Sequence, residues 1–506
     1  MANITVTPQG QVYLCKTPLE NDYKNQLTFA SATAQQTYFN STIFKSYDNY
    51  TYIKKDNVIM VGENIDTIIQ CNYLFYRNTG FTSKWYYCFI NNMEYVNENC
   101  TRITFETDCF QTWQFQIDYK KTFVEREHVN DDTVGLHTVP ENVELGEYVS
   151  NGVEYCALLD TTYYIVQSTE DIIGNDSNNL ATNYGGVPMV GNGYICEGMT
   201  DLVSVVNSFT QQDAIYGVHV VPRNFITKGS DYKYHGDATP KSYNYNFNKP
   251  STIDTYTPTN NKLLTFPYNY LLMSNNNGTS NILHYERFST TNCVFDVKGV
   301  PVVGASVKCS PKDYDGITIN EENGIVAGKF PTLNWSKDEY TNWLTQNAVN
   351  IGLGVAGSGL SIASSVATGN PIGIVGGILG VANTLGQVYE HSLQPDSARG
   401  NVNGADINYC SNKNGFFFYK MSIKQEYAKI IDGYFNLYGY KVNTVKVPNI
   451  TGRQNWNFVK TINCNFDGDI PQNDLNIIKN MFNEGVTLWH NPANIYNYSL
   501  SNNIVS

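Results

Sequence analysis

The residues whose types and spacing could carry out chemistry are few and scattered. Glu125, Arg126, Glu127 and His128 follow one another and could offer two metal ligands or an acid–base pair. On a strand, however, Glu125 and Glu127 point to one face while Arg126 and His128 point to the other, so the ligand types do not converge. The spacing therefore favours a structural cluster of ion pairs over a metal or catalytic site.

Two aspartate-rich runs and one glycine-rich run resemble fragments of ligand sites. Residues 313–316 (DYDG) and 467–469 (DGD) begin like calcium loops, but neither continues with the spacing of a full site. Residues 352–357 (GLGVAG) match G-x-G-x-x-G, yet no strand pattern precedes them and the next acidic residue is Glu390. We therefore expect turns at the two aspartate runs, and neither a metal nor a cofactor.

No sequence motif indicates a nucleophile with an activating base. The chain contains no G-x-S-x-G elbow, no H-E-x-x-H pair and no phosphate-binding P-loop. Its 11 cysteines are an odd number without a C-x-x-C pair, which predicts reduced and mostly buried thiols. We expect no catalytic residue. The enzyme alternative is a carboxylate pair that cleaves glycans, because such a pair converges in space without a sequence spacing.

The composition predicts which elements position these residues. Of the 506 residues 42% are hydrophobic and 16% are charged, and 38 tyrosines and 24 phenylalanines lie between short turn-forming runs. Aromatic and β-branched side chains favour strands, and the chain is too long for one ordinary core. The sequence therefore predicts a mainly β (α+β), multidomain protein.

The formal charge of −13 argues against a protein that grips nucleic acid, because phosphate binding needs dense Lys/Arg patches and none is apparent. An acidic wall would still let a polyanion slide past. The charge is thus compatible with a conduit, and equally with an acidic protein that is merely soluble.

Local patterns predict individual elements. The alternation in residues 113–119 (WQFQIDY) predicts a strand with one buried face. Helices are predicted at 32–39 after a Ser31 cap, near 202–209 after a Thr200 cap, and at 474–484 before Gly485. Long loops are predicted within 229–276. Further strands are predicted at 12–15, 58–61, 85–90, 103–105, 155–159, 163–166, 215–221, 293–297, 434–447 and 456–459.

One segment departs from the rest of the chain, because residues 340–389 carry no charged side chain. Residues 336–339 (SKDE) form a capping box before it, and two apolar arms, 348–367 and 372–388, flank a Gly-Asn-Pro turn. As helices rising about 1.5 Å per residue, the arms would span roughly 30 and 26 Å, close to the hydrocarbon thickness of a bilayer. A membrane-crossing hairpin is geometrically feasible.

The composition of the arms favours conditional insertion over permanent anchoring, since Gly, Ala and Ser outnumber Leu and Phe. Residues 373–377 and 376–380 are both G-x-x-x-G, which lets helices approach closely in lipid. A buried hairpin or a glycine-rich loop in an oligomer interface is the alternative. The apolar residues of this candidate membrane-active loop are Trp343, Leu344, Ile351, Leu353, Val355, Leu360, Ile362, Val366, Ile372, Ile374, Val375, Ile378, Leu379, Val381 and Leu385. Its glycines are Gly352, Gly354, Gly357, Gly373, Gly376, Gly377 and Gly380.

Several stretches near both ends resemble the tail-knob family of short-tailed bacteriophages of the Picovirinae and Salasmaviridae type. The clearest are residues 108–113 (DCFQTW) and 123–129 (FVEREHV), and residues 18–24 (PLENDYK) are similar to the family's opening. Near the end the resemblance rests on 432–435 (DGYF), 438–440 (YGY), Arg453, 456–460 (WNFVK) and 485–490 (GVTLWH). The middle of the chain resembles the family least.

The resemblance implies a structural protein of the virion that is not an enzyme. It implies a homo-hexameric tube of β-barrel or sandwich domains, like those of phage tail-tube proteins, at the tail tip. Phage DNA would pass through the lumen without sequence-specific binding, and other tail proteins of the lower collar and tail tip would be partners. It also implies that the long apolar loop plugs the tube and then penetrates the host cytoplasmic membrane.

The chain is accordingly expected to be made in the host cytoplasm and to fall into four parts. These are an N-terminal tube domain (1–150), a middle β domain with long loops (151–335), the apolar membrane-active loop (336–400) and a C-terminal part that completes the tube (401–506). A receptor-binding tail spike and the glycan-cleaving tail enzyme are the alternatives. A spike would tolerate loss of residues 345–388, and an enzyme would turn over glycan.

Overall fold

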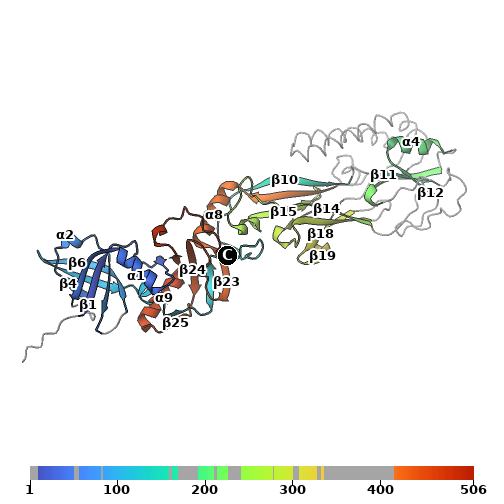
Figure 1. Cartoon of the computed structure of the whole chain (residues 1–506). Helices are drawn as coiled ribbons and strands as arrows, with labels where there is room; N and C mark the ends of the chain where they lie inside the picture. Colours follow the sequence, from blue (N-terminus) through green and yellow to red (C-terminus); the bar gives the residue numbers. More distant parts are fainter. Residues whose placement is uncertain are drawn as a thin grey trace, which may run out of the picture. The chain divides into compact units, whose positions relative to one another are not determined.

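The computed structural model divides the chain into two compact units (Figure 1). Unit 1 comprises Met1–Glu144, Thr259–Lys262 and Ile430–Ser506, and unit 2 comprises Leu145–Pro258 and Leu263–Lys429. The structure describes residues 9–50, 56–80, 84–158, 162–168, 192–209, 214–225, 241–276, 278–299, 307–327, 332–334 and 415–505. The four-part division expected from the sequence stays a prediction, since residues 335–414 lie outside these ranges.

The first sheet of unit 1 has the strand order β3-β1-β5-β6-β7-β4. One face packs aliphatic side chains such as Leu14, Leu74 and Ile103, and the other packs aromatic rings such as Phe75 and Tyr87. Side chains therefore alternate between two cores, as the period of a strand requires. The strands are β1 (Gly10–Cys15), β3 (Ile43–Tyr50), β4 (Val58–Val61), β5 (Tyr73–Asn78), β6 (Tyr86–Asn97) and β7 (Cys100–Thr107).

The second sheet of unit 1, in the order β2-β26-β24-β9-β23, joins the two ends of the chain. β2 pairs in parallel with β26, and β9 lies between β24 and β23. Figure 1 shows the red C-terminal elements β24 and α9 beside the blue N-terminal elements. The strands are β2 (Asn25–Leu27), β9 (Thr122–Glu127), β23 (Tyr440–Lys446), β24 (Trp456–Ile462) and β26 (Val486–Trp489).

Short helices close the cores of unit 1. Ser31 caps α1 (Ala32–Ser41), because its Oγ accepts from the Ala34 amide at 3.2 Å. In α9 (Gln472–Glu484) the predicted face of Leu475, Ile478, Met481 and Phe482 is buried. Gly485 follows with φ +101°, a conformation that favours glycine. The helices predicted at 32–39 and 474–484 are confirmed. Unit 1 also contains α2 (Ile65–Ile68), α3 (Cys109–Trp113) and the strand pair β8 (Ile117–Asp118) and β25 (Asp467–Gly468).

Two sheets of unit 2 share one hydrophobic core. The rings of Phe295 and Phe418, one from each sheet, lie 4.3 Å apart between centroids. One sheet has the order β10-β22-β15-β16 and the other β14-β17-β18-β19, with β20 paired to β18. The strands are β10 (Tyr148–Ala157), β14 (Lys241–Asn248), β15 (Asn269–Ser274), β16 (Ser280–Leu283), β17 (Asn292–Gly299), β18 (Val307–Tyr314), β19 (Ile317–Ile319), β20 (Ile325–Val326) and β22 (Gly415–Ile423).

A third sheet of unit 2 has the order β12-β11-β13-β21 and carries a helix. That helix, α4 (Met199–Asn207), buries Leu202 and Val206 against the sheet, as predicted, but its cap is Gly198 and not Thr200. The strands are β11 (Thr162–Ser168), β12 (Asn192–Cys196), β13 (Ile215–Pro222) and β21 (Thr332–Asn334).

Three predictions from local patterns were wrong. The strand predicted at 113–119 is instead the end of α3, a turn and β8, because Asp108 Oδ1 caps α3 by accepting from the Gln111 amide at 3.0 Å. The first part of the strand predicted at 434–447 belongs to helix α8 (Gln425–Tyr438). Within the predicted loop region 229–276, β14 and β15 are strands.

The described residues confirm that the chain is mainly β. The described cysteines are reduced thiols, and all but Cys100 are buried. Within the described ranges no helix has the length and apolar character needed to cross a bilayer.

Candidate functional site

All the predicted residues of the membrane-active loop, from Trp343 to Leu385 with its glycines, lie outside the described residues. The described part of the chain instead contains a dense polar cluster in unit 1, built on the end of β9. We call it the ionic clasp. Its members are Arg126, Glu127, His128, Asp132, Glu141, Lys262, Asp432, Lys446, Arg453 and His490.

Glu141 is a fully enclosed carboxylate of the ionic clasp, with none of its side chain exposed. It pairs with Arg126, accepts from Lys262 Nζ at 2.6 Å and accepts from the Lys441 amide at 2.8 Å. Burial lowers the pKa of Lys262, and Glu141 opposes that shift by favouring the ammonium. Arg126 and Lys262 thus share the buried carboxylate of Glu141, and each of the three charges is compensated only while the others are present.

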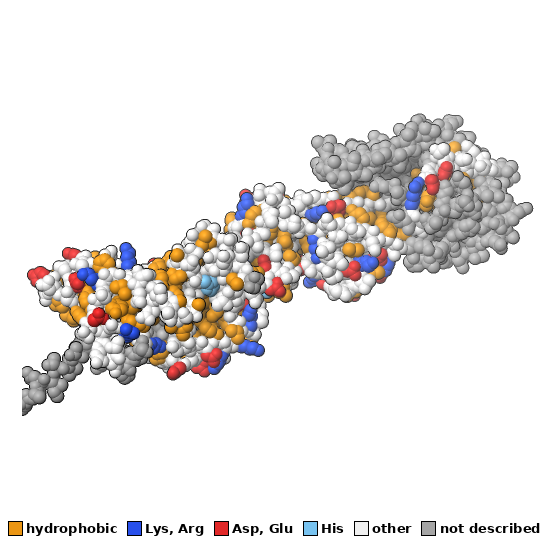
Figure 2. Space-filling model, in the orientation of Figure 1, with side chains coloured by type: hydrophobic (Ala, Val, Ile, Leu, Met, Phe, Trp, Pro, Cys, Tyr) orange, Lys and Arg blue, Asp and Glu red, His pale blue; other side chains and the backbone are white. Residues whose placement is uncertain are grey.

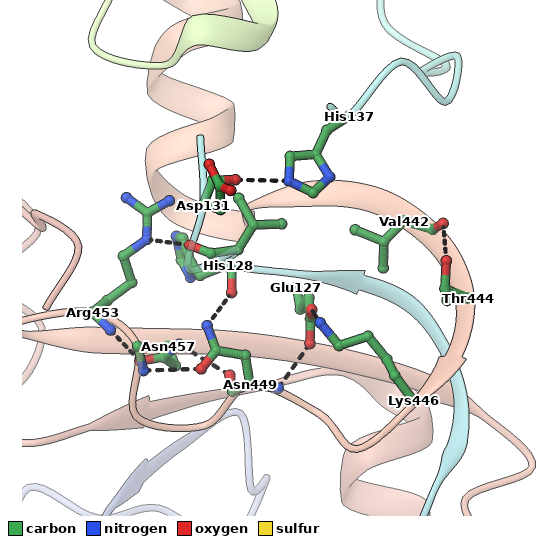
Figure 3. Close-up of polar contacts among 12 residues, drawn as sticks. Glu127, His128, Asp131, His137, Val442, Thr444, Lys446, Asn449, Arg453 and Asn457 are labelled. Carbon is green, nitrogen blue, oxygen red and sulfur yellow. Dashed lines mark hydrogen bonds and ion pairs between the residues drawn. The ribbon is translucent and has the colours of Figure 1, made fainter. Parts of the chain in front are cut away.

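The neighbouring residue Glu127 is also fully buried and fully paired. Its carboxylate binds Lys446 and accepts from the Asn449 amide at 2.8 Å (Figure 3). Glu125, which is partly exposed, pairs with Lys460 at 2.9 Å. The ion pairs predicted within residues 125–128 are present at Glu125, Arg126 and Glu127.

His128 has both ring nitrogens engaged, and its backbone carbonyl accepts from Asn449 Nδ2 at 2.8 Å (Figure 3). Nδ1 accepts from the Phe458 amide at 2.7 Å, so Nε2 carries the proton and donates to the Asn436 carbonyl at 3.0 Å. Burial, helped by the charge of Arg453, lowers the pKa of His128 to about 3. The ring is therefore neutral, and protonating it would remove the acceptor that the Phe458 amide needs.

His490 is held in the same way on the other side of β24. Its Nε2 lies 2.9 Å from Asn457 Oδ1, which can only accept, so Nδ1 accepts from the Thr28 hydroxyl at 2.9 Å. Burial lowers the pKa of His490 to about 4. The ionic clasp thus holds two neutral histidines.

The ionic clasp also fixes the four-residue segment Thr259–Lys262, which belongs to unit 1 although its neighbours belong to unit 2. Asp432 accepts from the Thr259 amide at 2.8 Å and the Asn260 amide at 3.0 Å. Asp132 accepts from the Asn261 amide at 2.9 Å and from the Tyr440 hydroxyl at 2.6 Å. Glu141, Lys262 and Asp432 each lie within three residues of a point where the chain passes between unit 1 and unit 2.

The arrangement of the ionic clasp is suited to holding the chain and not to catalysis. Each of its carboxylates is occupied by a backbone amide or a cation, which leaves none placed to act on a substrate. Among the described residues, no group of three or more His, Cys, Asp or Glu side chains could hold a metal ion. The aspartate run 313–316 covers the end of β18 and then the predicted turn, with Asp315 and Gly316 at positive φ. The turn predicted at 467–469 was wrong, because Asp467 and Gly468 form the short strand β25, which pairs with β8.

Sequence reasoning identified only part of the ionic clasp. Residues 125–128 were recognised because four ionisable groups adjoin a strand pattern. Glu141, Lys262 and Asp432 were missed because no other charged residue adjoins them in sequence, and Asp132 was missed because it lies beyond the strand pattern that ends at residue 128. Only the fold brings them together, so no spacing could have revealed them.

The visible surface carries acidic and basic side chains that are interspersed. Figure 2 shows blue and red side chains scattered over the described surface, without a continuous basic stripe on this face. Together with the net charge of −13, this distribution is that of a surface that does not bind nucleic acid tightly.

Comparison with known proteins gives consistent matches over the whole chain. The family profile described as "Bacillus phage phi29, Tail knob protein gp9, C-terminal domain" matches residues 230–503. The profile "Caudoviral major tail protein N-terminus" matches residues 10–120. The tail knob protein gp9 of Bacillus phage phi29 is 25% identical over 100% of both chains, and that of Bacillus phage B103 is 25% identical over 96% of this chain and 97% of the relative.

A solved structure has the same fold. It is described as the structure of the bacteriophage C1 tail knob protein, gp12, with a TM-score of 0.63 and 13% identity over 98% of this chain and 100% of that chain. The predicted resemblance to phage tail-knob proteins is confirmed by the profile and the full-length relatives. The chain is a structural tail protein of a virion and belongs to the family of the tail knob protein gp9 of Bacillus phage phi29.

Proposed function

We propose that this tail knob protein forms a homo-hexameric tube at the tail tip, through which phage DNA leaves the particle. Full-length similarity to tail knob proteins carries the proposal. The absence of a continuous basic stripe on the face shown in Figure 2 and the net charge of −13 support it, because a wall that does not bind phosphate lets a polyanion slide. Other tail proteins of the lower collar and tail tip are the expected neighbours.

We further propose that residues 336–400 plug the tube and later penetrate the host cytoplasmic membrane. The observation that supports this step is the uncharged segment 340–389 with its two apolar arms. In an assembled tube, several copies of this segment would be hidden from water. On release beside lipid, burial of apolar surface at about 25 cal/mol per Å² would drive insertion, and no catalytic residue is needed.

Electron microscopy of the purified protein tests the tube. We expect closed rings of six copies with an open or plugged central channel. A protein that stays monomeric at micromolar concentration in the absence of other tail proteins, and also in their presence, would contradict the tube.

Flotation with liposomes tests the role of the segment. Val381→Asp places a charge in the middle of the second arm, where insertion of Asp costs about 2.5–3.5 kcal/mol. Asn370→Asp adds the same charge at the turn between the arms and serves as the matched control. We expect Val381→Asp to lose membrane binding and Asn370→Asp to retain it. Equal binding by both variants would contradict insertion of the arm.

A further inference from the structure

The sheet β10-β22-β15-β16 of unit 2 is apolar on both of its faces. Its inner face contributes Phe416, Phe418, Leu271 and Met273 to the shared core. Its outer face is defined by the side chains that alternate with these along each strand. A sheet that is apolar on both faces is normally covered on both.

A row of apolar side chains crosses the whole outer face. Val153 of β10 pairs with Tyr419 of β22, Tyr419 pairs with Leu272 of β15, and Leu272 pairs with Ile282 of β16. Ile282 is 46% exposed, and the other three side chains are half-buried. The row is continuous from one edge of the sheet to the other.

Aromatic residues continue this surface on both sides of the row. Tyr155 stacks on Phe417 with ring centroids 4.5 Å apart. On the other side Met421 pairs with Tyr270, whose ring lies 5.5 Å from that of Tyr148. These positions and the central row contain no charged side chain.

The opposite sheet of the same core shows what a solvent-facing surface looks like in this unit. The outer positions of β17 and β18 include Lys298 and Lys308, and Lys298 pairs with Glu321 at 2.8 Å. The outer positions of β14 are Ser242, Asn244 and Asn246. The two outer faces therefore differ in kind, and only that of β10-β22-β15-β16 lacks charge.

We propose that this uncharged outer face is the dock on which the chain's own segment 340–389 is stored, an inference that rests on the proposed function of that segment. The segment is the one long uncharged stretch of the sequence, so its character matches the face. It is also tethered there, because the chain passes from β21 at Asn334 to β22 at Gly415, and β22 is an inner strand of the dock. The tether from 390 to 414 could extend about 80 Å at roughly 3.3 Å per residue, so reach does not limit docking.

A photo-crosslinking side chain, benzoyl-phenylalanine, placed at Leu272 in the full chain tests the dock. We expect crosslinked peptides from 340–389 in a product of monomer mass. Products of dimer mass that map to folded parts of another copy would overturn the proposal, as would a lack of crosslinks, which would mean that the face meets solvent.

A charge on the dock gives an independent readout. Leu272→Lys should speed hydrogen exchange in peptides from 340–389 by about tenfold, because the stored segment loses apolar contact. Val294→Lys adds the same charge to the outer face of β17 and should leave that exchange unchanged. Equal exchange in the two variants would overturn the dock. Membrane leakage by released protein is measured separately, so a failed dock with intact leakage contradicts storage here and leaves membrane penetration standing.

Discussion

Glu141 neutralises two buried cations, and this makes it the most sensitive single residue of the ionic clasp. Lys262 has 2% of its side chain exposed, and Arg126 has 11%. A buried pair contributes little net stability compared with an apolar replacement, but loss of one partner leaves a charge without compensation.

The first prediction is that Glu141→Gln lowers the free energy of unfolding of unit 1 by about 3–5 kcal/mol, because both cations stay buried. Urea denaturation measures the effect. The matched control is Glu94→Gln, which breaks the exposed pair with Arg102 at 3.3 Å and should cost less than about 1 kcal/mol. Similar losses in the two variants would show that Glu141 is not buried with its cations.

The second prediction concerns pH. Burial lowers the pKa values of His128 and His490 to about 3 and about 4, below the ordinary histidine value near 6.5. As the pH falls below about 6.5 the unfolded chain takes up these protons first, so unit 1 loses about 1.4 kcal/mol per pH unit for each histidine. The loss attributable to His490 ends near pH 4.

Asp108 acts in the opposite direction, since burial raises its pKa to about 7 and acidification from that pH adds stability. The histidine effect is therefore isolated by comparing variants. Unfolding free energies measured from pH 7 to pH 4.5 should fall less steeply in His490→Gln than in the unchanged protein, by about 1.4 kcal/mol per pH unit. Parallel pH profiles would contradict a buried neutral His490.

At the scale of elements, Gly439 forms the tight link between α8 and β23. Its φ is +64°, and a Cβ at this position would lie 2.1 Å from the Glu127 carbonyl oxygen. The backbone conformation and the close approach both require glycine. The link sets the start of β23 beside β9, where Glu127 is positioned for Lys446.

The third prediction compares two glycines that lie near each other in sequence. Gly439→Ala should destabilise unit 1 by more than about 2 kcal/mol, since strain and a backbone clash combine. Gly433→Ala, inside α8 with nothing within 4 Å of the added Cβ, should stabilise it by roughly 0.5–1 kcal/mol. Thermal unfolding of both variants checks the pair. An unchanged midpoint for Gly439→Ala would be inconsistent with this geometry.

The elements that could be predicted were those whose pattern is local. The α9 face, the Ser31 cap and the strand at 58–61 follow from spacing within a few residues. The segment 113–119 was misread because Trp and Phe alternate there, whereas Phe115 is 41% exposed and Trp113 Nε1 donates to Asp474 of α9 at 2.7 Å. The local Asp108 cap of α3 and this contact with a distant part of the chain together account for the difference from the predicted strand.

Helix α8 is an element whose local pattern was present in the sequence but was overlooked. Ala428, Ile431 and Phe435 are buried at helical spacing, but the sequence pattern was read from the aromatic run that begins at 434. Aromatic content favours strands only where no helical period precedes it. The ionic clasp could not be predicted beyond residues 125–128, because its other charges come from separate parts of the chain, such as Lys262 and Asp432, that meet only in the folded unit.

At the scale of the whole molecule, the folded units and the uncharged segment have different proposed roles. The paired ends of the chain build unit 1, whose ionic clasp holds the segments that lead to and from unit 2. The uncharged segment 340–389 lies outside the described residues and is proposed to act on the membrane. Removing it should therefore leave the folded units intact.

Dye release from liposomes by the assembled protein tests the central claim most directly. The whole chain is compared with a variant in which residues 345–388 are replaced by a short Gly/Ser linker, at neutral and mildly acidic pH, with assembly checked by electron microscopy. The account predicts leakage by the intact protein and none by an equally well-assembled deletion. Rings formed by both variants without leakage from either, under both conditions, would contradict membrane penetration and leave the segment as a plug or core element of the tube.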